Sequence, residues 1–216
     1  MMKVALRILG SSRTGTRGQA LPVAMGALAL GAILITPLLA GAGTGATATM
    51  DNVAAALYLT EGSRKIRKIA GINQNYAWGQ DSWNDFEAAM KVLDPGVDVA
   101  TSQMPKLLAG QYGAEISTLL SSGADVVHSS VWGGDLDALI LQGAPRGLFR
   151  KSTVVLTAGE TAVQKLGAQI PDGTIIGARG PFDMFAPDTE LNRWLRKAYS
   201  DRYDVPPSYP SYKMVQ

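Results

Sequence analysis

The chain contains no cysteine and only one histidine, His128, among its 216 residues. The absence of cysteine excludes disulfides, thiolate metal sites, cysteine nucleophiles and a lipid anchor attached through an N-terminal cysteine. A single histidine excludes a histidine-rich metal site. We therefore expect no metal and no cofactor bound through such ligands.

Charge is missing from a long stretch near the N-terminus, because no charged residue lies between Gly18 and Met50. Residues 1–60 carry four basic groups and one acid, a net +3, whereas residues 61–216 carry 16 basic and 17 acidic groups, a net −1. The basic character thus belongs to the N-terminal segment. Nucleic acid binding needs a basic face on the folded part, and the sequence predicts none.

The sequence also lacks the residue sets that catalysis requires. His128 lies within an apolar strand, which favours a packed, hydrogen-bonded histidine, and consecutive residues of a strand point to opposite faces. Asp135 and Asp137 are two residues apart in a helical pattern and do not face each other. No phosphate-binding loop is visible, because the glycines of Gly41–Gly45 do not follow a strand. We therefore do not expect an enzyme.

The uncharged stretch contains 21 apolar or small residues, Ala20–Ala40. About 20 such residues suffice to cross a bilayer as a helix. Basic residues precede the stretch and an acid follows it, which predicts that residues 61–216 lie outside the cytoplasm. A cleaved secretory signal and a retained anchor are both compatible with this pattern, and both predict export to the periplasm or the cell surface.

Arg17–Met25, with the sequence RGQALPVAM, resembles the leader junction of type IV pilin-like and Tad-type secreted proteins. In that interpretation Asp51–Gly62 continues the apolar helix close to the membrane. A generic hydrophobic anchor is the simpler reading of the same residues. Either way, the sequence predicts two parts: a signal or transmembrane segment with linker over residues 1–62, and a globular domain over 63–216.

After Gly62, short apolar strands alternate with amphipathic helices. This alternation predicts an α/β fold, a three-layer, Rossmann-like, mostly parallel sheet preceded by the N-terminal hydrophobic helix. The predicted strands are Lys68–Asn73, Val97–Ser102, Asp125–Ser130, Thr153–Thr157 and Thr174–Ala178. The predicted helices are Asp81–Leu93, Tyr112–Ser121, Asp135–Gln142, Thr161–Gln169 and Asp188–Tyr203.

The turns that follow these strands carry aromatic side chains. Ligands of open α/β sheets bind beyond the carboxyl ends of the strands, so we expect four such turns to meet at one edge. Asn75–Gln80 is predicted to be a loop, with Asp81 capping the helix after it. The residues expected to gather at this edge are Tyr76, Trp78, Trp132, Glu160 and Phe182. This mixture suits a small polar ligand with a cationic group.

Three phrases carry a resemblance to a known family: NQNYAWGQDSW after the first strand, the run from Ser102 to Gln142, and RGLFRKSTVVLTAGE. They resemble the solute-binding proteins of ABC importers of the branched-chain amino acid, amide and urea class, with the type I periplasmic-binding fold. The resemblance extends from about Ile66 to Tyr212, roughly two-thirds of the chain. It matches mainly the second of two lobes, so the resemblance implies that residues 63–216 form a partial periplasmic solute-binding domain, a truncated or fused copy.

The resemblance implies that Glu160, preceded by Gly159, pairs with an ammonium or amide group of the solute. The alternative is an acid favoured by the positive end of its own helix. Trp132 and Gly133 are implied to contact the solute, or else they form an ordinary strand-to-helix turn. Tyr76 and Trp78 lie in a polar stretch, which favours contact with ligand or with the opposing lobe.

These observations predict a non-catalytic, exported solute-binding component of an ABC importer for amino acids or related small amides. Its expected partners are the solute, a membrane permease and the membrane itself through residues 20–40. A membrane-tethered ligand sensor is a second interpretation. A pilin-like surface protein that carries the α/β part as a passenger is a third.

Overall fold

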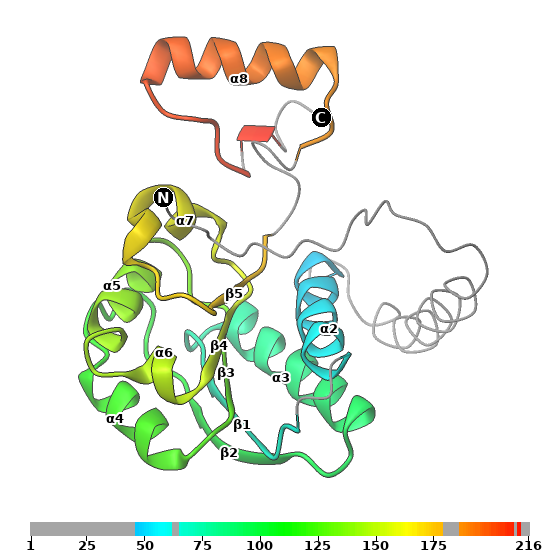
Figure 1. Cartoon of the computed structure of the whole chain (residues 1–216), viewed down its shortest axis with the longest axis vertical. Helices are drawn as coiled ribbons and strands as arrows, with labels where there is room; N and C mark the ends of the chain where they lie inside the picture. The colour runs from blue at the N-terminus through cyan, green and yellow to red at the C-terminus, as the bar shows by residue number, and fades with distance from the viewer. Residues whose placement is uncertain (1–45, 62–64, 179–185, 210, 213–216) are drawn as a thin grey trace, which may run out of the picture.

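The structure is a computed structural model that describes residues 46–61, 65–178, 186–209 and 211–212. Its centre is a five-stranded sheet in the order β2-β1-β3-β4-β5, in which every pair of neighbours is parallel (Figure 1). The strands are β1 (Lys68–Ile72), β2 (Asp98–Gln103), β3 (Val126–Ser129), β4 (Thr153–Leu156) and β5 (Ile175–Ile176). All five predicted strands are confirmed. Strands β1, β3, β4 and β5 are shorter than expected, and β2 has the expected length but lies one residue later.

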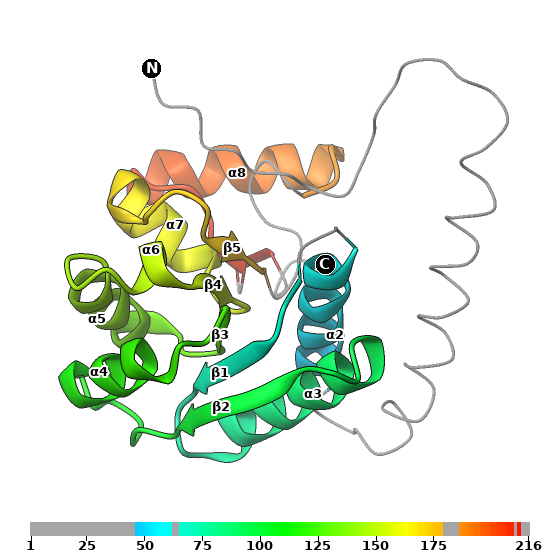
Figure 2. The ribbon, with the colours of Figure 1, turned by 60° about the horizontal axis from the view of Figure 1, so that its bottom comes forward.

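Helices cover both faces of the sheet and complete the expected three layers. The described helices are α2 (Ala46–Thr60), α3 (Ala77–Leu93), α4 (Gly113–Ser122), α5 (Gly133–Gly143), α6 (Leu148–Lys151), α7 (Glu160–Leu166), the 3-10 turn η1 (Gly167–Gln169) and α8 (Glu190–Tyr203). Helix α8 does not belong to these layers, because its buried Leu195 packs with Ala186 and Tyr212 in a separate small cluster. Figure 2 shows α2 and α3 on one face and α4, α5 and α6 on the other. The short helix α6 was not predicted.

The two faces bury separate apolar clusters because neighbouring residues of a strand point to opposite sides. Ile69 of β1 joins the cluster beneath α2 and α3, whereas Ala70 joins the cluster beneath α4 and α5. The same alternation holds in β3, where Val126 and Val127 belong to different clusters. The period-2 pattern therefore builds the core on both sides of the sheet.

Helix α3 begins earlier than predicted. The expected loop Asn75–Gln80 is mostly helical, Tyr76 is the N-cap residue, and Asp81 does not cap the helix. The backbone N–H of Asn75 donates to the carbonyl of Pro105 at 2.7 Å, which fixes the entry of the chain. Gly79 then passes so close to the turn after β1 that an added Cβ would lie 2.0 Å from the Gln74 carbonyl oxygen. The Asn75–Pro105 bond, which joins distant parts of the chain, overrides the stronger capping preference of aspartate.

Helix α2 was not predicted as part of the sheet's covering layer. Residues 51–60 of the stretch expected beside the membrane lie in α2, and Val53, Ala56 and Leu59 are buried in the cluster shared with α3. Their i, i+3, i+6 spacing places them along one side of the helix. The side chain of Asn52, also buried, lies 2.8 Å from Nε2 of His128. The division of the chain at residue 62 into two domains stays a prediction.

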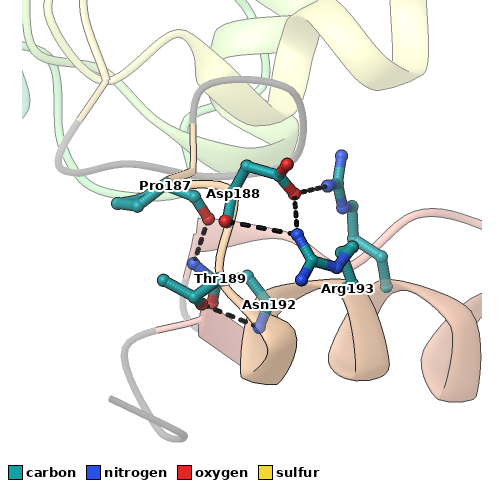
Figure 3. Close-up of polar contacts among 6 residues, drawn as sticks. Pro187, Asp188, Thr189, Asn192 and Arg193 are labelled. Carbon is teal, nitrogen blue, oxygen red and sulfur yellow. Dashed lines mark hydrogen bonds and ion pairs between the residues drawn. The ribbon is translucent and has the colours of Figure 1, made fainter.

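Helix α8 begins at Glu190, two residues later than predicted, because Thr189 caps it. The Thr189 hydroxyl accepts the backbone N–H of Asn192 at 3.2 Å, and the Asn192 side chain donates to the Pro187 carbonyl at 2.8 Å (Figure 3). Arg193 donates to the carboxylate of Asp188 at 2.8 Å. The Thr189 contact satisfies one of the backbone N–H groups that the first helical turn leaves without an intrahelical partner, and the two side-chain bonds tie the start of α8 to the residues before it.

Within the ranges that the structure describes, no helix is both long enough and apolar enough to cross a membrane. The predicted membrane segment Ala20–Ala40, the leader-like Arg17–Met25 and Phe182 all lie outside these ranges.

Candidate ligand-binding edge of the sheet

The turns after β1 and β3 meet at the carboxyl edge of the sheet, as the parallel pairing of these two strands requires. Tyr76 is the N-cap residue of α3, and Trp132 is the N-cap residue of α5. The indole Nε1 of Trp132 donates a hydrogen bond to the phenolic oxygen of Tyr76 at 2.7 Å. The bond lies at the surface, and 38% of Trp132 is exposed. Two of the predicted site residues are therefore in direct contact.

Buried polar contacts hold these two turns together from below. The side-chain oxygen of Asn73 accepts the backbone N–H and the hydroxyl of Ser130, both at 2.8 Å. Gln74 donates its amide to the carboxylate of Asp135 at 2.7 Å. All four side chains are at most 5% exposed, so these bonds are shielded from water and hold the ends of β1 and β3 in fixed relation.

Asp135 lies in the first turn of α5, whose N-cap residue is Trp132. Its carboxylate accepts the backbone N–H groups of Leu108 at 2.7 Å and Gly110 at 3.1 Å, in addition to Gln74. Burial, and secondarily the nearby Asp135 carboxylate, raise the pKa of Tyr112 at the end of this loop. Asp135 thus joins the β2–α4 loop to the same edge.

Two further predicted residues have plain structural features. Trp78 lies in the first turn of α3 and is half-buried, and its indole Nε1 is buried without a hydrogen-bond partner among the described residues. Gly133 has a φ of +63°, a conformation that other residues rarely adopt, and no atom within 4 Å of an added Cβ. The backbone conformation at the start of α5 therefore explains why glycine occupies position 133.

The turn after β4 carries Gly159 and Glu160. A Cβ on Gly159 would lie 2.8 Å from Cγ2 of Ile176, so glycine is required there by packing against β5. Glu160 is the first residue of α7 and is only 1% exposed. The pairing of β3 with β4 places this turn at the same edge as Trp132. Whether Glu160 binds a solute stays a prediction.

The histidine has the packed, hydrogen-bonded environment that the sequence predicts. His128 is fully buried, its ring stacks on Phe86 at 4.3 Å between centroids, and its partner is Asn52. Burial lowers the pKa of His128 to about 3. Among the described residues, no group of three or more histidine, aspartate or glutamate side chains could hold a metal ion.

A cavity of about 370 Å³ lies at the opposite, amino-terminal edge of the sheet, between the starts of β1, β2 and β3. Among its charged lining residues, the Asp125 carboxylate accepts the backbone N–H groups of Arg67 and Lys68 at 2.8 and 3.0 Å. The Arg67 backbone hydrogen bond, foremost, holds the pKa of Asp125 below its usual range. These contacts give Asp125 a structural role in holding the starts of β1 and β3 together. The carboxyl edge of the sheet is therefore the better candidate for ligand binding.

Solved structures with the same fold are solute-binding proteins. An amino acid ABC transporter substrate-binding protein from Pseudomonas fluorescens Pf-5 is 20% identical, with a TM-score of 0.62 over 76% of this chain and 42% of its own. A solute-binding protein from R. palustris in complex with benzoate is 16% identical, with a TM-score of 0.61 over 74% and 42%. An extracellular ligand-binding receptor from Rhodopseudomonas palustris is 14% identical, with a TM-score of 0.63 over 77% and 48%.

This chain thus spans less than half the length of each of these structures. At such identities the likeness shows the fold alone. No curated protein matches the chain in sequence. The sequence profile of the periplasmic binding protein family matches residues 16–215, nearly the whole sequence. The chain belongs to the periplasmic binding protein family.

Proposed function

We propose that this chain is the solute-recognition component of an ABC importer, and that the carboxyl edge of its sheet contacts an amino acid or a related small amide. The observation that carries the proposal is the Tyr76–Trp132 hydrogen bond at 2.7 Å. It places two aromatic side chains of adjacent turns side by side at the surface, where open α/β sheets bind ligands.

The chemistry of this pair fits a solute with a hydrogen-bond acceptor. Trp132 uses its one donor on Tyr76, so the Tyr76 hydroxyl, which accepts that bond, keeps its own proton to donate. A carboxylate is a good acceptor for such a donor. Glu160 at the neighbouring turn supplies a negative charge that suits an ammonium group. Together these groups match the two ends of an amino acid.

The relatives give two solute classes to compare. One is named for amino acid transport, and another was crystallised with benzoate, which has a carboxylate but no ammonium group. Under the proposal, Glu160 distinguishes between them. We propose further that the chain acts outside the cytoplasm, beside a membrane permease, with Ala20–Ala40 serving as signal or anchor.

Calorimetric titration of the full-length chain with L-leucine, benzoate and urea tests the proposal. Saturable binding of leucine is expected, weakened by Trp132→Ala through loss of the aromatic contact. Trp194→Ala is the matched control, because Trp194 is 59% exposed on α8, remote in sequence from the edge. Glu160→Gln should weaken leucine binding about tenfold or more through loss of a charge-assisted bond, with little effect on benzoate. Absence of binding by all three probes would contradict the proposal.

A further inference from the structure

The loop between β2 and α4 is fastened to the candidate site at several points. The Pro105 carbonyl accepts the N–H of Asn75, the residue before Tyr76. Asp135, three residues after Trp132, accepts the N–H groups of Leu108 and Gly110. The loop therefore lies beside both turns that carry the aromatic pair.

A second side chain of α5 reinforces this attachment. The Gln142 amide donates to the Gly110 carbonyl at 3.0 Å, and its oxygen accepts the N–H of Tyr112 at 2.9 Å. Together Asp135 and Gln142 make four hydrogen bonds to the backbone of this loop. Such dense bonding to an irregular segment fixes the conformation of the residues between the bonds.

The conformation fixed in this way is unfavourable for the residue that adopts it. Leu108 has a φ of +60°, and among the described residues only Asp204 shares a positive φ without being glycine. The left-handed conformation costs a residue with a Cβ roughly 1–2 kcal/mol. Leu108 nevertheless gains no burial in return, because 78% of it is exposed, and the adjacent Leu107 is 40% exposed. Strain held at an exposed apolar residue is the kind of outlier from which a functional contact is inferred.

We infer that Leu108 contacts the apolar part of the bound solute and that Asp135 is the positioning residue that holds it there. This inference rests on the proposed function and adds a selectivity-determining loop to it. The loop sequence Leu107-Leu108-Ala109 offers only apolar side chains next to Lys106, so it favours solutes with an apolar side group over smaller ones. A hydrophobic contact of this size discriminates by about tenfold or more.

The test compares L-leucine with L-alanine, which share both charged ends and differ in the apolar group. The wild-type full-length chain should bind leucine more tightly. Leu108→Ser should weaken leucine binding roughly tenfold and alanine binding much less, so that the selectivity between the two falls. Leu141→Ser is the control, because Leu141 is 47% exposed near the far end of α5 and should leave both affinities unchanged.

Asp135→Asn tests the positioning role. The substitution replaces one carboxylate oxygen with an NH₂ group, which cannot accept a hydrogen bond from the loop N–H groups. The loop should therefore be released, and the backbone amides of Leu108 and Gly110 should exchange hydrogen faster. The selectivity for leucine over alanine should fall as it does in Leu108→Ser. An equal loss for leucine and alanine would indicate a general structural role and overturn the positioning role. If Asp135→Asn does not fold, Leu108→Ser decides the matter alone.

The possible results separate the two proposals. Binding of leucine and alanine with a selectivity that Leu108→Ser leaves unchanged overturns this inference while the proposed function stands. Failure of the wild-type chain to bind either amino acid overturns both.

Discussion

The indole of Trp132 and the phenol of Tyr76, 56 residues apart in the chain, share a hydrogen bond of 2.7 Å at the surface of the protein. The bond joins the N-cap residues of α3 and α5, two helices on opposite faces of the sheet. It orients both rings without embedding either in the core. Such an arrangement serves recognition better than stability, because an exposed hydrogen bond contributes little net free energy of folding.

Tyr76→Phe should therefore separate binding from stability. The free energy of unfolding should change by less than about 1 kcal/mol, whereas leucine affinity should fall because Trp132 loses its acceptor and the solute loses a donor. Calorimetry and thermal unfolding measure the two effects. Tyr203→Phe, at a tyrosine 55% exposed on α8, provides the control. Unchanged leucine affinity in Tyr76→Phe would argue against the proposed role.

His128 should make the protein less stable in mild acid. Its pKa is about 3 in the folded chain because of burial, against 6.5 for the exposed imidazole. Between these values the unfolded chain binds one proton more, so the free energy of unfolding falls as the pH falls, by about 1.4 kcal/mol per pH unit. The contribution is complete above pH 6.5 and stops changing below pH 3. Unfolding at pH 7.5 and 5.5 should show a smaller loss in His128→Gln than in the wild type. Identical losses in the two proteins would refute this explanation.

Packing of α2 on α3 can be tested at two alanines of the same helix. Ala56 is fully buried in the cluster between the helices, whereas Ala54 is exposed. Ala56→Leu should overpack this contact and lower the free energy of unfolding by about 1–3 kcal/mol. Ala54→Leu should change it little. Equal effects of the two substitutions in thermal unfolding would mean that α2 does not pack as described.

Gly79 should not tolerate even a methyl group. A Cβ there would meet the Gln74 carbonyl oxygen at 2.0 Å, and the backbone of Gln74 cannot easily move away, because it lies two residues after the central strand β1 and its side chain bonds to the buried Asp135. Gly79→Ala should therefore destabilise the protein by about 1–3 kcal/mol, although alanine favours helix formation. Gly96→Ala is the matched control, since the nearest atom there is 3.5 Å away. A Gly79→Ala protein as stable as the wild type would show that the turn can relax.

The strands were predictable because their signal is local. Runs such as Thr153–Leu156 are short, apolar and β-branched, and turn residues bound them. The start of α3 was not predictable in this way. Asp81 is the better capping residue by type, but the helix begins at Ala77 because Asn75 bonds to Pro105, a contact between segments 30 residues apart. The packing of α2 on the sheet was missed, because Asp51–Gly62 was interpreted as the continuation of an apolar helix close to the membrane.

The candidate site was predictable to the same extent. Parallel topology alone brings Tyr76 and Trp132 to one edge, and their contact confirms that expectation. The role of Asp135 could not be read from its position in the helix, because its partners are backbone groups 25 and 27 residues earlier in the chain. The positive φ of Leu108 could not be predicted from the sequence either, because the residue at that position is neither glycine nor asparagine.

The buried hydrogen bonds of Asn73 to Ser130 and of Gln74 to Asp135 order the turns that carry Tyr76 and Trp132 during folding. Because these bonds form within the protein itself, the aromatic turns are already ordered before any small molecule arrives. The entropy of arranging them is lost during folding, so under the proposed function the solute meets a preformed surface and its association costs less. Under that function, affinity depends on how well the solute fits, because the surface has little freedom to adapt.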